Sequence, residues 1–188
     1  MAHQTLTDGA MERLETNRLI LERLRPEHRD ALGRLHRDPQ VMATLGGVRR
    51  AEETERVLAE CDRHWEQYGF GLWAVRMKAT GLFAGRGGLK HTFIGERDEV
   101  EVAYALLPQY WGQGLATELA VASVRAGFEL LHRPDLVCFT LTTNRASQRV
   151  MEKVGFCYEC DVIHAGLPHV FYRLSASAWH PNPQAVTG

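Results

Sequence analysis

The sequence lacks any apolar run near the roughly 18 residues that a membrane-spanning helix needs. It also lacks an excess of either charge, because 22 Lys and Arg residues face 23 Asp and Glu residues. Bulk attraction to nucleic acid or to a membrane surface is therefore not expected. The first ten residues are polar and contain no apolar signal core. We expect a cytoplasmic protein with neither nucleic-acid nor membrane partners.

Cysteine is scarce, and its four positions are scattered through the chain: Cys61, Cys138, Cys157 and Cys160. Such spacing does not suit the disulfide framework of a small secreted domain. Cys157 and Cys160 form a C-x-x-C pair, but a zinc site normally requires a second pair. The histidines show no chelating spacing such as H-E-x-x-H. The sequence therefore predicts free thiols in a reducing compartment and no metal site.

The chain shows no repeat, low-complexity segment or linker that would divide it. Its 188 residues are enough for one domain with a sizeable core. We expect that domain to cover residues 11–180. Residues 1–10 and 181–188 are expected to be loosely held ends.

Hydrophobic periodicity predicts the element order β-α-α-β-β-β-α-β-α-β-β. Three antiparallel-type strands in succession and one β-α-β crossover favour an α+β fold with a mixed central sheet. Gly85, Gly87 and Gly88 indicate a bend or a close approach in the third strand. The polar residues 91–98 are expected to form a loop. The predicted strands are 18–24, 71–77, 82–89, 100–106, 136–141, 156–163 and 170–174, and the predicted helices are 26–37, 51–68, 115–131 and 146–154.

Gly112 and Gly114 lie between a strand and a strongly apolar helix. Backbone N–H groups can converge on an anion at such a helix start, where the helix dipole is positive. The loop is not a P-loop, because no Lys follows Gly114. It is not a dinucleotide fingerprint either, because Thr117 stands where a third small residue belongs. The pattern alone indicates an anion site or simply a tight turn.

Three segments, one of which contains this glycine loop, resemble the GNAT acetyltransferase superfamily, and most of all its RimJ/RimL-like branch. They are Val-Glu-Val-Ala-Tyr at 100–104, Tyr-Trp-Gly-Gln-Gly-Leu-Ala-Thr-Glu at 110–118 and Asn-x-x-Ser-x-x-Val-Met-Glu-Lys-x-Gly-Phe at 144–156. The segment 14–21 also looks like the opening strand of that branch. The resemblance covers residues 14–174. It implies a mixed, mostly antiparallel twisted sheet with helices on both faces, and acetyl-CoA as the donor.

The resemblance also implies where CoA binds. The family's loop signature fits here with either Gln109 or Trp111 in first place, and the Trp111 register agrees better with the helix start. Trp111 then replaces the usual Gln or Arg, which matters little because backbone N–H groups bind the pyrophosphate. The implied pyrophosphate site comprises Trp111, Gly112, Gln113, Gly114, Leu115, Ala116 and Thr117. The pantetheine arm would follow the backbone of Ala105, Leu106 and Leu107, and Asn144 would contact it.

Amine acetylation needs a base for the amine and a proton for the departing thiolate. Glu101 stands where the family often places its base, and Glu99 shares its strand face. Alternatively, either glutamate could simply be a solvent-exposed acid on the strand face, without a catalytic role. Met151 replaces the tyrosine that many members use as acid, so Ser147 is the candidate, unless it only caps a helix. No cysteine lies in a recognisable nucleophile motif, so we expect direct attack in a ternary complex.

The acceptor is the least defined part of the site. Phe70, Trp73 and His91 are candidates to line it, although aromatic residues in and beside a strand, such as Phe70 and Trp73, are more often core. The resemblance implies an amine acceptor, either a protein N-terminus or a small molecule such as an antibiotic or polyamine. A CoA-binding sensor without turnover is the alternative, another acyl chain stays open, and a homodimer is possible.

Overall fold

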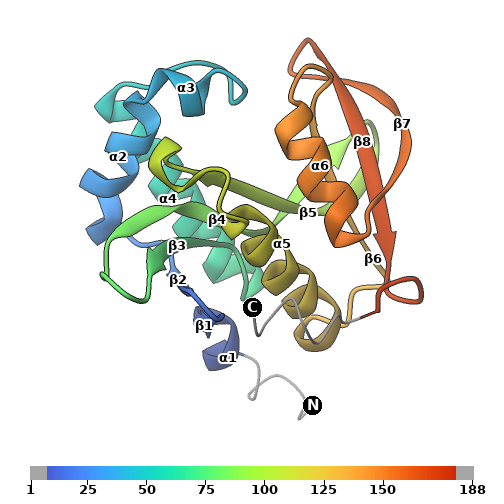
Figure 1. Ribbon diagram of the computed structural model, residues 1–188, viewed down its shortest axis with the longest axis horizontal. Helices are drawn as coiled ribbons and strands as arrows, with labels where there is room; N and C mark the ends of the chain where they lie inside the picture. The colour runs from blue at the N-terminus through green and yellow to red at the C-terminus, as the bar shows by residue number, and fades with distance from the viewer. Residues whose placement is uncertain (1–7, 181–188) are drawn as a thin grey trace.

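The computed structural model describes residues 8–180, and one eight-stranded sheet forms its centre (Figure 1). The strand order is β1-β2-β3-β4-β5-β6-β8-β7, and every neighbouring pair is antiparallel except β5 with β6. The predicted mixed, mostly antiparallel sheet is thereby confirmed. Its strands are β1 (Arg13–Glu15), β2 (Leu19–Arg23), β3 (Leu72–Met77), β4 (Phe83–Ile94), β5 (Arg97–Leu106), β6 (Asp135–Leu141), β7 (Cys157–His164) and β8 (Leu167–Ser175).

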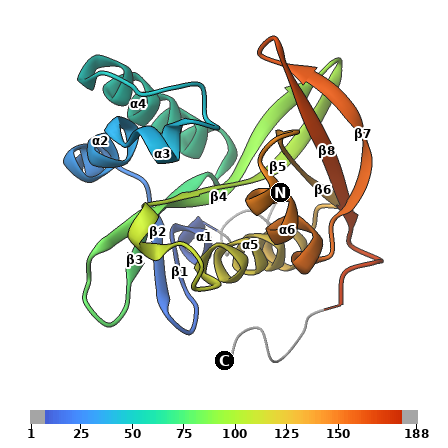
Figure 2. The ribbon, with the colours of Figure 1, turned by 45° about the horizontal axis from the view of Figure 1, so that its top comes forward.

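Helices cover both faces of this sheet, as Figure 2 shows. One face carries α2 (Arg29–Arg37), α3 (Pro39–Met42) and α4 (Ala51–Tyr68), and the other carries α5 (Leu115–Arg125) and α6 (Arg145–Val154). A wider helical turn, Ala126–Leu130, prolongs α5, so the predicted helix 115–131 is nearly continuous. Short 3-10 turns occupy Pro26–His28 and Pro108–Tyr110, and α1 is Asp8–Glu12. The sequence predicts loose ends at 1–10 and 181–188. Residues 8–10 of the first belong to α1, and residues 1–7 and 181–188 lie outside the described residues.

Two hydrophobic layers hold the helices to the sheet. Under α5, Leu115 and Leu119 pack with Val100 and Val102 of β5, and all four are at most 2% exposed. On the other face, Leu58 of α4 belongs to a smaller apolar cluster against β3. Each fully buried Leu contributes about 2 kcal/mol. Together these layers hold β5 between α5 and α4.

The hairpin of β4 and β5 extends further than the sequence predicts. Residues 91–98 are not a loop, because β4 runs to Ile94 and β5 starts at Arg97. The pair Thr92–Glu99 continues the ladder beyond the core. Polar residues dominate this extension, so it carries no hydrophobic pattern that predicts a strand.

Asp38 and Pro39 also play a different part from the expected one. They end α2, as predicted, but they start α3 at the same point. The Asp38 carboxylate accepts hydrogen bonds from the N–H groups of Gln40 (2.9 Å) and Val41 (3.1 Å). An Asp cap followed by Pro is a helix start as well as a stop, and the sequence reading used only the stop.

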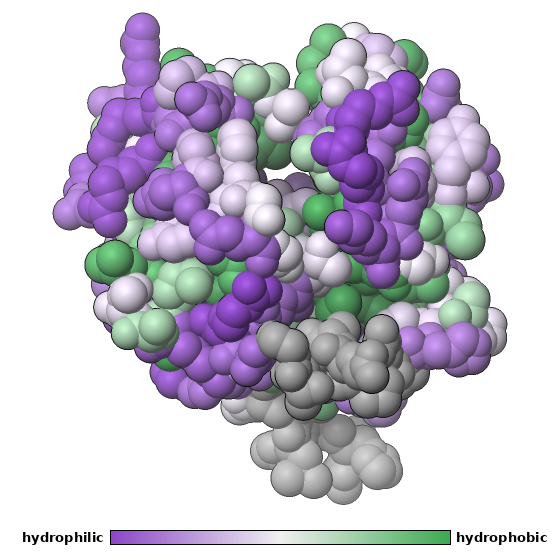
Figure 3. Space-filling model, in the orientation of Figure 1, coloured by the Kyte–Doolittle hydropathy of each residue, from purple (hydrophilic) through white to green (hydrophobic). Residues whose placement is uncertain are grey.

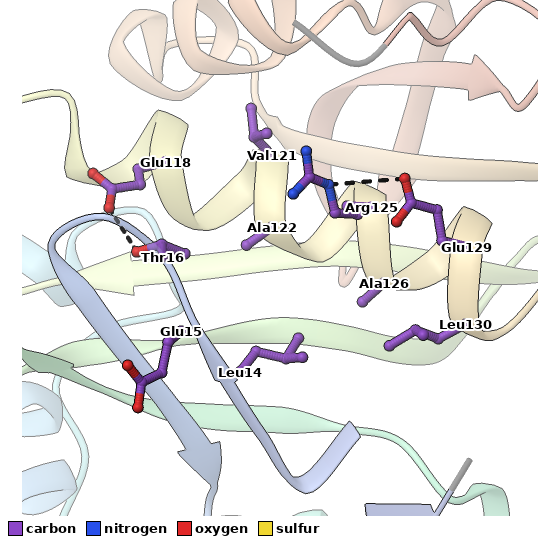
Figure 4. Close-up of a pocket in the computed structure, with 10 residues that line it drawn as sticks. All are labelled: Leu14, Glu15, Thr16, Glu118, Val121, Ala122, Arg125, Ala126, Glu129 and Leu130. Atoms are coloured by element: carbon purple, nitrogen blue, oxygen red, sulfur yellow. Dashed lines mark hydrogen bonds and ion pairs between the residues drawn. The ribbon is translucent and has the colours of Figure 1, made fainter. Parts of the chain in front are cut away.

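A buried carboxylate fastens the N-terminal strands to α5. Glu118 is 7% exposed and accepts hydrogen bonds from the Thr16 hydroxyl (2.6 Å) and the Arg18 guanidinium (2.7 Å). Figure 4 shows the Thr16 contact at the rim of a hollow of about 230 Å³ between β1 and α5. The sequence reading did not single out Glu118, whose partners lie about a hundred residues away. This contact fixes the start of α5 against the sheet.

His36 of α2 makes folding stability depend on pH. It is fully buried, and burial together with the charges of Arg86 and Arg49 lowers its pKa to about 4 from an ordinary 6.5. Below pH 6.5 His36 binds a proton in the unfolded chain but not in the folded protein. The unfolding free energy is therefore highest above pH 6.5 and falls as the pH drops toward 4. We expect His36 to make the protein about 2 kcal/mol less stable at pH 5 than at pH 7.5.

Urea unfolding at both pH values measures this difference. His36→Gln should remove most of the difference in unfolding free energy between the two pH values that His36 causes. The exposed control His132→Asn should leave that difference unchanged. Equal pH dependence in wild type and His36→Gln would contradict the assignment.

All four cysteines are free, Cys61 and Cys138 buried and the other two exposed on β7. Within residues 8–180, no three His, Cys, Asp or Glu side chains are grouped so that they could hold a metal ion. None of the helices in that range combines the length and the apolar character needed to cross a membrane.

Candidate active site

The strands β5 and β6 part in the middle of the sheet. Their parallel pairing consists of Glu101 with Val137. Beyond that pair β5 continues to Leu106 along β4, and the Leu107 N–H still donates to the Ala84 carbonyl of that side (2.8 Å). The backbone edge of β5 that faces β6 is therefore left without a strand partner among the described residues. This is the edge on which the resemblance to the GNAT superfamily would place the pantetheine arm.

Glycine in β4 permits the close packing of β5 and α5 at this point. A Cβ at Gly85 would lie 2.2 Å from the Ala105 carbonyl oxygen. A Cβ at Gly87 would lie 2.6 Å from Leu119 Cδ2 of α5. The close approach expected from these glycines is thus observed, and it positions Ala105 and Leu106 at the fork.

The glycine loop follows directly. Gly112 and Gly114 have φ values of 72° and 77°, a left-handed conformation that glycine adopts without strain. Gly114 caps α5, which begins at Leu115, so the first-turn N–H groups point out of the helix end. Residues 111–114 are exposed, and Figure 3 shows a notch between the half that carries α3 and the half that carries α6. An exposed, positively polarised helix start suits a pyrophosphate.

Trp111 has a defined place in this loop. Its indole N–H donates to the Leu106 carbonyl at the end of β5 (2.7 Å), while 48% of the residue stays exposed. Arg18 donates to the Gln113 carbonyl from the other side (2.9 Å). These two contacts hold the loop open between β5 and α5.

The start of α6 faces the same fork. Asn144 caps this helix, since its Oδ1 accepts from the Ser147 N–H (3.2 Å) and its Nδ2 donates to the Thr140 hydroxyl (2.9 Å). Both ends of the Asn144 amide are thus used within the protein. The cap is Asn144 and not Ser147, so the Ser147 hydroxyl is available for another role.

Tyr104 of β5 lies against Ser147. The two hydroxyl oxygens are 2.9 Å apart, and the Tyr104 hydroxyl also donates to the Ser147 carbonyl (3.2 Å). Burial raises the pKa of Tyr104 well above its ordinary value, so the phenol keeps its proton. The sequence reading missed Tyr104. The alternation that assigns Val100, Val102 and Tyr104 to one face contained the signal, but only the fold brings that face to α6.

Glu101 lies at the point where the strands part, on the opposite face from Tyr104. It is 8% exposed, and its Oε2 is buried without a hydrogen-bond donor in the described part of the chain. Lys90 Nζ approaches Oε2 to 3.6 Å, a distance of ionic attraction and not of a hydrogen bond. A buried carboxylate oxygen with no donor can accept one from a bound ammonium group.

Glu99 is occupied in a different way. Arg173 of β8 binds both of its oxygens, at 2.7 and 3.1 Å, and also contacts Asp135 and Glu159. A carboxylate held at both oxygens by a guanidinium is a poor proton acceptor. The geometry disfavours Glu99 as the alternative base.

The aromatic candidates for the acceptor site lie elsewhere than expected. Trp73 is fully buried and donates its indole N–H to the Met11 carbonyl (2.7 Å), so it is core and cannot line an open site. Phe70 is 5% exposed and packs against His64 and His91. The core alternative therefore holds for Trp73 and its candidacy for the acceptor site fails, because strand alternation does not tell which face is open.

His91 does line a cavity, although from β4 and not from a loop. A groove of about 300 Å³ lies between α4 and the strands β3 and β4, and we name it the α4–β4 groove. It adjoins Glu101 through Lys90, which lines the groove and pairs with Glu101 across the two strands. Arg86, which also lines it, is a second residue that the sequence reading missed. A lone Arg between glycines of β4 was the available signal.

Comparison with known proteins agrees with this architecture. The family model described as an acetyltransferase (GNAT) domain matches residues 18–157. The Bacillus subtilis protein YkkB is 31% identical over 166 residues, which cover 88% of this chain and 96% of the relative. The FsC-acetyl coenzyme A-N(2)-transacetylase of Aspergillus fumigatus is 33% identical over 164 residues, 81% of this chain and 68% of the relative.

Solved structures show the same fold. An acetyltransferase from Agrobacterium tumefaciens superposes with a TM-score of 0.75 at 26% identity, covering 86% of this chain and 93% of that one. The spermidine N-acetyltransferase of Vibrio cholerae, solved with CoA and spermine, superposes at 0.69 with 15% identity, covering 85% and 96%. The sheet that forks at Glu101, the open helix start after Gly114 and the match over residues 18–157 agree, so the chain belongs to the GNAT acetyltransferase family and is an acetyl-CoA-dependent N-acetyltransferase.

Proposed function

We propose that this enzyme acetylates a primary amine by direct attack within a ternary complex, with Glu101 as the base. The observation that carries the proposal is the buried, unpartnered Oε2 of Glu101 at the fork of β5 and β6. It lies between the edge proposed for the thioester and the α4–β4 groove proposed for the amine. A proton acceptor between donor and acceptor sites is what the reaction needs.

The proposed chemistry takes two protons from the amine and gives one to the sulfur. Acetyl-CoA supplies an acetyl group activated as a thioester. Glu101 takes a proton from the acceptor ammonium, directly or through water, so that the nitrogen lone pair can form the new C–N bond. The nitrogen then loses its second proton to water, and as the C–S bond breaks, Ser147 gives its hydroxyl proton to the leaving sulfur and is reprotonated from water. Tyr104 keeps its own proton and holds the Ser147 hydroxyl in place. The products are an acetylated amine, CoA and one proton, which Glu101 releases to solvent.

Removing either hydroxyl of the Ser147–Tyr104 pair should slow turnover modestly. We expect Ser147→Ala and Tyr104→Phe each to lower kcat about 10-fold. The effect is modest because a thiolate is a good leaving group and departs with little help from a general acid. The double variant should be little worse than either single one, since the two hydroxyls act as one hydrogen-bonded pair. Initial rates of thiol release at saturating acetyl-CoA measure this effect.

Two controls accompany that measurement. Tyr158→Phe removes an exposed tyrosine hydroxyl on β7 and should leave kcat unchanged. The unfolding free energy of Ser147→Ala should stay within about 1 kcal/mol of wild type, because Asn144 remains as the cap. A wild-type kcat in Ser147→Ala would remove Ser147 from the mechanism.

The family branch and the residues that bind CoA belong to the same proposal. Motif likeness supports the RimJ/RimL-like branch, and with it a protein N-terminal or small-molecule amine. The first-turn N–H groups of 115–117 with loop residues 111–114 would bind the pyrophosphate, and residues 105–107 would lie along the pantetheine arm. Asn144 would act by holding Ser147. Cytoplasmic location, a single domain over 11–180 and a homodimer stay predictions.

An acceptor screen tests the proposal. The purified protein is incubated with acetyl-CoA and with peptides, amino acids, polyamines or aminoglycosides, and released thiol is measured together with the mass of the product. We expect at least one class to gain one acetyl group on nitrogen. Acetyl-CoA binding by calorimetry with no transfer to any class would instead favour a sensor.

A further inference from the structure

The α4–β4 groove carries more positive than negative charge. Arg49, Arg86 and Lys90 line it, against one lining carboxylate, Glu60, with Glu101 beyond Lys90. The apolar part of the lining comes from Val57 and Leu72, and the Cys61 thiol also faces the groove. Burial raises the pKa of Cys61, so this thiol stays neutral and does not offset the cations.

His64 is one of the two histidines that line the groove, and it is neutral. The Nε2 of His64 accepts a hydrogen bond from the His91 N–H (2.9 Å), so its proton resides on Nδ1, which donates to the Phe70 carbonyl (2.8 Å). Burial also lowers the pKa of His64, which favours the same neutral form. His64 therefore shapes the wall of the groove.

Arg86 is the least satisfied cation of the set. Its Nε is buried without a hydrogen-bond partner, and within residues 8–180 its guanidinium makes no ion pair with a carboxylate. Two other arginines of this sheet, with 11% and 25% of the side chain exposed, are bound: Arg23 and Arg173 each contact three carboxylates. A guanidinium fork with free donors inside a cavity matches the geometry of a carboxylate.

The charges of Arg86 and Arg49 also act on a buried histidine. His36 lies behind the groove, fully buried, with Nδ1 3.0 Å from the Thr54 hydroxyl and Nε2 without a partner. The positive charges of Arg86 and Arg49 act together with burial to keep this imidazole neutral. Two guanidinium groups thus act on His36 against the opposing charge of Glu53, and within residues 8–180 neither guanidinium forms an ion pair with a carboxylate.

We infer that the acceptor is a small amine that also carries a carboxylate, as amino acids do, with Arg86 binding the carboxylate and Glu101 receiving the amine. This inference rests on the proposed function. The proposed function places the amine at Glu101, and the unpartnered Nε of Arg86 lies in the adjoining groove on the same strand pair. A polyamine or aminoglycoside would bring further positive charge against Arg49, Arg86 and Lys90 and is disfavoured.

Matched acceptor pairs test the inference. Amino acids with the amine at increasing distance from the carboxylate are each compared with the carboxamide of the same skeleton, and spermidine and a neutral-sequence peptide are included. We expect the best carboxylate acceptor to exceed its carboxamide by about 10- to 100-fold in kcat/KM, chiefly through KM, because a charge-assisted bidentate contact is lost.

Variants of Arg86 assign the preference to one residue. Arg86→Gln should reduce the carboxylate preference to within about three-fold of unity, and Arg86→Lys should retain part of it. The KM for acetyl-CoA should not change in either variant. Arg29→Gln, an exposed arginine of α2, is the matched control and should keep the full preference. The thermal midpoint of Arg86→Gln should equal or exceed that of wild type, since no internal ion pair is removed.

The outcomes separate the inference from the function beneath it. If spermidine, the peptide or the carboxamides are acetylated as well as the carboxylates, the inference is wrong while the proposed function stands. If no amine of any class is acetylated, both fail. A carboxylate preference that survives Arg86→Gln overturns the assignment to Arg86.

Discussion

Replacing Glu101 by Gln should lower kcat/KM for the amine acceptor by about 100- to 10,000-fold near neutral pH, the range spanned by a lost general base. The change keeps the size of a side chain that is 8% exposed, and it replaces the unpartnered Oε2 with a group that cannot accept the amine's proton. Because free amine becomes abundant at high pH without help, the deficit should shrink as the pH rises toward the amine pKa of about 10.

Initial rates of thiol release from pH 6.5 to pH 9.5 measure this effect. The KM for acetyl-CoA should stay within two-fold of wild type, because Glu101 is not among the residues proposed to bind CoA. Glu96→Gln, in the exposed turn of the same hairpin, is the matched control and should keep full activity. A Glu101→Gln enzyme with near wild-type rates at pH 7 would show that water or another group deprotonates the amine.

Replacing Arg173 by Met should lower the unfolding free energy by about 3 kcal/mol. The change removes contacts of 2.7 and 3.1 Å to the two oxygens of Glu99. It leaves that carboxylate, whose side chain is 8% exposed, without its ion-pair partner. Breaking one partner of a buried pair costs about 3–5 kcal/mol, and the low end applies because a quarter of the Arg173 side chain is exposed. Contacts of the same guanidinium with Asp135 and Glu159 add little, since those carboxylates are more exposed.

Urea unfolding of single and double variants separates the pair from its surroundings. Glu99→Gln combined with Arg173→Met should cost at least 1 kcal/mol less than the sum of the two single changes. Arg97→Met, on the exposed end of β5, should change stability by less than about 0.5 kcal/mol. Additive losses would mean that the two side chains do not act as a pair.

The same variants decide between the two candidate bases. Glu99→Gln should reduce kcat less than ten-fold, measured on folded protein at a temperature well below its unfolding midpoint. If Glu99→Gln lowered the rate as much as Glu101→Gln, Glu99 would again be a candidate for the base.

Local sequence pattern by itself determined most of the elements and the glycine turn before α5. The apolar spacing along residues 51–68 and 115–131 defines helix faces, because 3.6-residue periodicity is a property of the segment alone. Gly112 and Gly114 predict a left-handed turn before a helix, since glycine adopts positive φ at low cost. The ordered motifs from Glu101 to Asn144 and Ser147 then indicated the family. Each of these signals is contained within a few neighbouring residues.

Tertiary structure decided which of these side chains can act. Glu99 and Glu101 are equivalent in the strand pattern, and only Arg173, 74 residues from Glu99, takes one of them out of use. Tyr104 meets Ser147 across 43 residues, and Trp73 is buried beneath a helix that begins at residue 8. The unpartnered Arg86 appears only once α4 covers β4. Such pairings depend on which strand edges and faces meet, and local periodicity carries no information about a partner far along the chain.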